Sequence, residues 1–104
     1  MEHEKTPIDL NDYRRSVTTN DGVDLSVIVV GEGPPLVILP PWSNGAIAYR
    51  DLIEDFARDH RVIAVDMRGH GRSQKVEHGY RISRLAADLE TVLDDLEVED
   101  AVLL

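Results

Sequence analysis

The spacing of hydrophobic and polar positions changes several times along the 104-residue chain, and each change predicts a new element. Residues 13–19 alternate loosely, and every second position of residues 23–30 is apolar, as is typical of strands with one buried face. Between them stand Asn20, Asp21 and Gly22, residue types that tolerate the positive φ of a tight turn. These segments predict an antiparallel hairpin at the edge of a sheet.

Two runs that are apolar throughout follow, residues 36–39 and 62–65, and such runs suit strands that are buried on both faces of a parallel sheet. A helix is predicted between them, beginning near Ala46, because apolar residues recur there at helical spacing. The positions expected to face the core are Tyr49, Leu52, Ile53, Phe56 and Ala57.

A longer helical stripe runs over residues 82–96 and leads into a further apolar run at residues 101–104, in which the chain stops. The apolar positions of the stripe are Ile82, Leu85, Ala86, Leu89, Val92, Leu93 and Leu96. The outer face of this helix is predicted to carry Asp88, Glu90, Asp94 and Asp95. These acids are interpreted as a solvent-exposed face and not as an acidic binding site.

The predicted order is therefore hairpin, strand, helix, strand, helix, strand. Strands that alternate with helices in this way predict an α/β fold with parallel pairing and right-handed crossovers. Residues 1–12 are polar and are predicted to be a tail, and residues 13–104 to be one incomplete α/β domain.

Composition narrows the classes of partner. Twenty acidic residues against eleven basic ones give a net charge of −9, which disfavours nucleic acid and anionic membranes as partners. The absence of cysteine excludes disulfides, thiolate zinc sites and a cysteine nucleophile, and the four histidines lack metal-ligand spacing. No metal or cofactor is expected. Residues 1–12 lack the apolar run of a secretory signal and no segment reaches membrane-spanning length, so a cytoplasmic location is expected.

Residues 61–73, R-V-I-A-V-D-M-R-G-H-G-R-S, stand at the centre of this pattern. Their turn closely resembles the one after strand 4 in the α/β-hydrolase superfamily. Residues 36–49, L-V-I-L-P-P-W-S-N-G-A-I-A-Y, are similar to its strand 3 and oxyanion loop, and residues 82–104 to its run into the nucleophile elbow. With three matches in order, the chain is identified as a member of the superfamily, covering strands 1 to 5 of the N-terminal half.

The resemblance assigns a role to Trp42. In this superfamily the loop after strand 3 usually reads His-Gly-X, and the backbone N–H of X is one of two donors to the oxyanion. Here Pro40 and Pro41 take the places of His and Gly, and Trp42 takes the place of X. Trp42 is therefore the candidate catalytic residue through its backbone N–H, and its ring is also a candidate core aromatic. The implied substrate is a small acyl compound such as an ester or lactone.

The serine, acid and histidine that the resemblance would require are not found in this chain. Ser73 lies in G-R-S-Q-K, which lacks the second glycine of the G-x-S-x-G elbow. Asp66, Arg68 and His70 include triad residue types, but in the superfamily this turn is a structural brace and its Asp is not the triad acid. We therefore expect the 104-residue chain to be inactive by itself.

Two alternatives remain open. A dinucleotide-binding fold would place Asp66 on a ribose, but it needs a glycine-rich turn after the preceding strand, where only Gly45 is found. In function, the chain could instead be a non-catalytic α/β module that associates with a partner, including a second copy, through an open apolar sheet edge. That edge would be formed by Ala101, Val102, Leu103 and Leu104.

Overall fold

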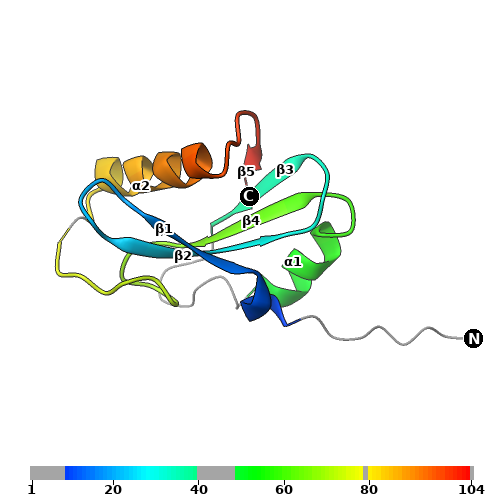
Figure 1. Ribbon diagram of the computed structural model, residues 1–104, viewed down its shortest axis with the longest axis horizontal. Helices are drawn as coiled ribbons and strands as arrows, with labels where there is room; N and C mark the ends of the chain where they lie inside the picture. Colours follow the sequence, from blue (N-terminus) through cyan, green and yellow to red (C-terminus); the bar gives the residue numbers. More distant parts are fainter. Residues whose placement is uncertain (1–8, 40–48, 79, 104) are drawn as a thin grey trace, which may run out of the picture.

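The computed structural model describes residues 9–39, 49–78 and 80–103. These form a five-stranded sheet in the order β1-β2-β4-β3-β5 (Figure 1). The β1–β2 and β2–β4 pairs are antiparallel, and the β3–β4 and β3–β5 pairs are parallel. The elements are the 3-10 helix η1 (Leu10–Tyr13), β1 (Arg14–Thr18), β2 (Asp24–Val30), β3 (Pro35–Ile38), α1 (Arg50–Phe56), β4 (Arg61–Asp66), α2 (Ile82–Asp95) and β5 (Val102–Leu103). The predicted element order and the incomplete α/β fold class are confirmed.

The predicted hairpin is formed by β1 and β2. Gly22 has a φ of +83°, the conformation for which the turn was expected to need glycine. Two backbone hydrogen bonds close the turn: Gly22 N–H donates to Thr19 at 3.0 Å, and Thr19 N–H donates to Val23 at 2.9 Å.

The two helices lie on opposite sides of the sheet (Figure 1), and each covers its own apolar cluster. β4 contributes to both clusters, with Ile63 and Val65 on the α2 side and Val62 and Ala64 on the α1 side. All four of these side chains are fully buried, as expected for an apolar run in a central strand. Because β4 is packed on both faces, its end is held in place, and it positions the turn that follows it.

The predicted tail is wrong in its last part. Residues 9–12 lead into and form most of η1, where the Asp9 carboxylate accepts a hydrogen bond from the Asn11 N–H at 3.0 Å. The Leu10 side chain is fully buried in the cluster on the α1 side of the sheet. A single apolar residue among polar ones gives no periodic signal, which is why the sequence did not place it in the core. Residues 1–8 lie outside the described residues.

The apolar stripe of α1 is confirmed at four of its positions and wrong at one. Tyr49, Phe56 and Ala57 pack against the buried Ile53 cluster, whereas Leu52 is 39% exposed. Ala46, where this helix was expected to begin, lies outside the described residues.

The buried face of α2 differs from the predicted one at its two borders. It is centred on Leu85, Val92 and Leu96. Successive residues of an α-helix are rotated by roughly 100° around its axis. Measured from Leu85, Asp88 therefore lies about 60° to one side of the helix and Ala86 about 100° to the other side. Ala86 and Ile82 are exposed, whereas Asp88, which was assigned to the solvated face, is fully buried. No helix in the described ranges has the length and apolar character needed to cross a membrane.

Candidate functional site

The turn after β4 and the segment after β3 leave the sheet at the same end, because the two strands are parallel neighbours. In open α/β sheets this carboxyl end of the strands is where ligands bind. Trp42, the predicted oxyanion donor, belongs to the segment after β3 but lies outside the described residues. Its role therefore stays a prediction, and the described part of the site is the turn of residues 66–74.

Asp66, the last residue of β4, has a fully buried side chain that holds β1 and the turn together. Its Oδ2 atom accepts hydrogen bonds from the Arg14 guanidinium at 3.0 Å and from the Arg72 backbone N–H at 2.9 Å. A Cβ atom on Gly71 would lie 2.4 Å from the Asp66 carboxyl carbon, so the turn closes tightly over this carboxylate. These contacts support the prediction that Asp66 braces the fold.

Ser73 is 4% exposed, and both hydrogen-bonding functions of its hydroxyl are in use. The hydroxyl donates to the Asp66 carbonyl and accepts from the Ser26 N–H at 2.7 Å. A nucleophilic serine needs an accessible hydroxyl and a neighbouring base. The geometry of Ser73 therefore agrees with its exclusion as a nucleophile on sequence grounds.

Arg68 is fully buried and forms two bidentate ion pairs. Towards α2, its Nε and Nη2 atoms donate to Asp88 at 2.7 and 2.8 Å. Towards the hairpin, Nη1 and Nη2 each donate to Asp21 at 3.0 Å. Arg84, one helical turn before Asp88, donates to the same Asp88 carboxylate through Nε at 3.0 Å. The planar fork of a guanidinium suits this double pairing, which a lysine would not reproduce.

The electrostatics of this network keep Asp21 and Arg68 charged. Hydrogen bonds from Arg68, and then from the Thr19 hydroxyl, hold the pKa of Asp21 well below its ordinary value. Hydrogen bonds to Asp88, and then to Asp21, raise the pKa of Arg68 above its already high value. Sequence reasoning missed Asp88 because an acid at the border of a helical stripe looks like a surface residue. The available signal was its place next to the buried face, together with an arginine on the turn after β4.

His70 lies with Nδ1 2.9 Å from the Arg68 carbonyl oxygen. Asp66, Arg68 and His70 thus each contact a different part of the fold: β1, α2 with the hairpin, and the turn backbone. This arrangement supports a bracing role for the turn. Within the described ranges, no group of three or more His, Cys, Asp or Glu side chains is placed to hold a metal ion.

The family model for the alpha/beta hydrolase fold matches residues 34–104, which is more than half of the chain. The chain belongs to the α/β-hydrolase family. The match includes β3, β4, α2 and β5, the elements that carry the resemblance in the sequence.

Individual relatives come from several activities within this family. The chain is 37% identical over 87 residues to the non-heme chloroperoxidase CPO-A1 of Kitasatospora aureofaciens, a match that covers 83% of this chain and 32% of that protein. It is 43% identical over 93 residues to epoxide hydrolase A of Mycobacterium tuberculosis, covering 85% of this chain and 29% of that protein. The solved structure of the esterase RhEst1 from Rhodococcus sp. ECU1013 matches with a TM-score of 0.81 and 38% identity, covering 88% of this chain and 35% of the esterase.

The chain thus spans about a third of the length of these relatives. The matched part is the N-terminal part of the hydrolase fold. The sheet and the β4 turn belong to this part, and no G-x-S-x-G motif occurs in the sequence.

Proposed function

We propose that this chain is the N-terminal portion of a serine-nucleophile hydrolase that acts on an ester, a lactone or a similar acyl compound. The observation that carries the proposal is the parallel arrangement of β3, β4 and β5, with the Trp42 segment directly after β3. Likeness to the esterase RhEst1 favours the acyl class. The chloroperoxidase and epoxide hydrolase relatives show that this front half is also combined with other chemistries.

In the proposed reaction a serine attacks the acyl carbon, and a histidine oriented by an acid takes the serine proton. The negative charge that develops on the acyl oxygen is held by two backbone donors. Trp42 N–H would be one of them, and the residue after the nucleophile would supply the other. The serine, acid and histidine would come from residues outside these 104.

The test has two parts. The isolated chain should not hydrolyse p-nitrophenyl acetate above background, with or without Ser73→Ala, and loss of measurable turnover on that substitution would contradict the proposal. In an active hydrolase containing this chain, Trp42→Pro removes the N–H whereas Trp42→Ala keeps it. We expect Trp42→Pro to lower kcat by about 10²–10³, and Trp42→Ala to lower it much less. Equal losses from the two substitutions would count against the donor role.

A second candidate is a non-catalytic α/β module that associates through its sheet edge. It is favoured by the position of β5, which pairs with β3 and is the last strand of the sheet in the described part of the chain. Val102 in this strand is 62% exposed. The two candidates differ in whether Val102 contributes to self-association or only to a longer sheet, and sedimentation of the wild type and of Val102→Lys distinguishes them.

A further inference from the structure

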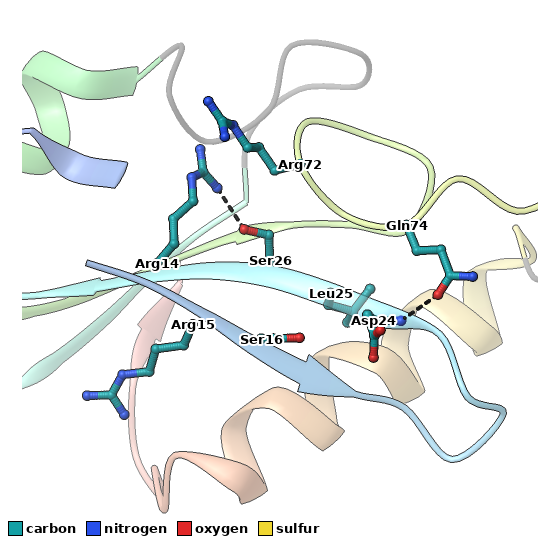
Figure 2. Close-up of a pocket in the computed structure, with 8 residues that line it drawn as sticks. All are labelled: Arg14, Arg15, Ser16, Asp24, Leu25, Ser26, Arg72 and Gln74. Carbon is teal, nitrogen blue, oxygen red and sulfur yellow. Dashed lines mark hydrogen bonds between the residues drawn. The ribbon is translucent and has the colours of Figure 1, made fainter. Parts of the chain in front are cut away.

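A pocket of about 490 Å³ lies beside the carboxyl end of β4, between the hairpin and the turn of residues 66–74 (Figure 2). Three arginines line it, Arg14, Arg15 and Arg72, together with polar side chains of β2 and the turn. Three arginines along one pocket are unexpected in a chain whose net charge is −9. Figure 2 shows Arg14 and Arg72 on one side of the sheet and Arg15 directed to the other side, so the site is built from the first two.

Three hydrogen-bond partners hold the Arg14 guanidinium in place along this pocket. Its Nε donates to Asn11 at 2.7 Å, and its Nη1 donates to the Ser26 hydroxyl at 2.8 Å and to Asp66 at 3.0 Å. The buried Asp66 carboxylate compensates the Arg14 charge, so Arg14 alone would not attract a further anion strongly. Arg14 can still help to bind a ligand because three partners fix its guanidinium in place before the ligand arrives.

Arg14 is already paired with Asp66, so a second arginine, Arg72, is the one that can pair with a ligand. Its backbone N–H donates to the same Asp66 oxygen that accepts from Arg14, so the Cα of Arg72 is fixed close to the Arg14 guanidinium. Within the described residues, the Arg72 side chain has no hydrogen-bond or ion-pair partner, and the residue is exposed. An arginine that is anchored by its backbone and unpaired at its guanidinium can close onto an anion without breaking an existing contact.

Gln74 lines the end of the pocket away from Arg14 and Arg72, and the Asp24 backbone holds its amide in place (Figure 2). Its Oε1 atom accepts from the Asp24 N–H at 3.0 Å, which leaves the amide NH₂ group of Gln74 available to donate. Asp24 also lines the pocket, and its carboxylate accepts from the Thr18 hydroxyl at 2.7 Å. Its negative charge offsets part of the arginine charge, so the pocket suits a ligand of low charge carrying one anionic group.

The geometry points to a binding site for an oxyanion group, carboxylate or phosphate, carried on a small organic molecule. Guanidinium groups bind both oxyanions through paired hydrogen bonds, and Arg72 is the group left free to form them. The pocket volume falls within the range of roughly 300–1,000 Å³ that is usual for small-molecule sites, which is more than an inorganic ion needs. The site is independent of the proposed hydrolase chemistry, since it uses neither Trp42 nor a nucleophile.

The experiment is an NMR titration of the ¹⁵N-labelled 104-residue chain with benzoate, phenyl phosphate and the neutral analogue benzamide. Benzoate or phenyl phosphate should shift the Ser26, Arg72 and Gln74 amides and saturate, and benzamide should not. Arg72→Gln should weaken binding at least fivefold. The matched control Arg58→Gln removes the same charge from an exposed position outside the pocket and should change the affinity less than twofold.

Saturation by only one of the two anions would assign the site to that oxyanion. The proposal is overturned if neither anion saturates, if benzamide shifts the same amides, or if Arg58→Gln weakens binding as much as Arg72→Gln. The thermal melt of Arg72→Gln should match that of the wild type, because the substitution keeps the backbone N–H that Asp66 binds. Loss of binding together with loss of folding would be resolved with Arg72→Lys, which keeps the charge without the planar fork and should bind more tightly than Arg72→Gln but more weakly than wild type.

Discussion

The Arg68 guanidinium and the Asp88 carboxylate form a bidentate ion pair with both side chains fully buried, at 2.7 and 2.8 Å. The pair joins the turn after β4 to α2, and Asp21 of the hairpin turn contacts the same guanidinium at 3.0 Å. One side chain therefore ties together three segments that are distant in sequence. This arrangement explains why the turn can be rich in titratable residues and still serve the fold.

Asp88→Ala should lower the free energy of unfolding by about 3–5 kcal/mol, the usual cost of removing one partner of a buried ion pair. The remaining guanidinium stays buried, with Asp21 as its carboxylate partner and the His78 carbonyl oxygen at 3.5 Å. Denaturant unfolding followed by circular dichroism would measure the loss. Asp94→Ala is the matched control, since Asp94 is an exposed acid on the same helix, and it should change stability by less than about 0.5 kcal/mol. Equal effects would mean that the pair adds nothing beyond helix propensity.

Asp21 predicts a pH dependence. Arg68 holds the pKa of Asp21 below its ordinary value of 3.8, so the carboxylate stabilises the fold fully above that pH. The contribution declines as the pH falls below 3.8 towards the lowered pKa of the folded state. Wild type should therefore be more stable than Asp21→Asn at pH 7, and the difference should shrink between pH 4 and pH 2. Parallel denaturant melts at several pH values would check this, and a difference that grew on acidification would contradict it.

Gly71→Ala should destabilise the chain more than Gly22→Ala. Both glycines have positive φ, +52° and +83°, so each substitution carries a backbone cost of about 1–2 kcal/mol. Only at Gly71 does the new Cβ meet a neighbour, 2.4 Å from the Asp66 carboxyl carbon, whereas Gly22 has nothing within 4 Å. Thermal or denaturant unfolding of the two variants would measure both losses, and the difference between them is the free energy needed to displace Asp66. Equal melts would show that the turn relaxes freely around this carboxylate.

The strands and their order along the chain were predictable because hydrophobic patterns and turn residues are local features of the sequence. Residues 62–65 are apolar throughout and are buried throughout, and the Asn20, Asp21, Gly22 turn forms where its residue types require it. The resemblance in the turn after β4 then identified the family. These inferences depend on a few neighbouring residues and not on contacts between distant segments.

The ion-pair network and the arginine pocket were not predictable in the same way. Asp88 is buried because Arg68 reaches it across 20 positions of sequence, and no periodicity records that pairing. Likewise, Arg14 and Arg72 meet on Asp66 only once β1 has found its register on β2. Sequence reasoning assigned the turn to bracing correctly, yet it missed the partners on α2 and the hairpin that do the bracing. Trp42 stays a prediction, since it lies outside the described residues.

Self-association of the chain through β5 is the remaining prediction. β5 pairs on one side with β3, and Val102 in it is 62% exposed, so a second copy can add its own β5 through backbone hydrogen bonds. The net charge of −9 opposes association, but its repulsion is screened within about 8–10 Å at ordinary salt. Hydrogen bonds between two β5 strands form at direct contact, so we expect them to outweigh the screened repulsion. Val102→Lys places a charge on this edge and should shift sedimentation towards monomer. Ile82→Lys makes the same change at a residue 77% exposed on α2 and should leave the association intact. A wild-type chain that sediments as a monomer across the micromolar range would refute the edge as an interface.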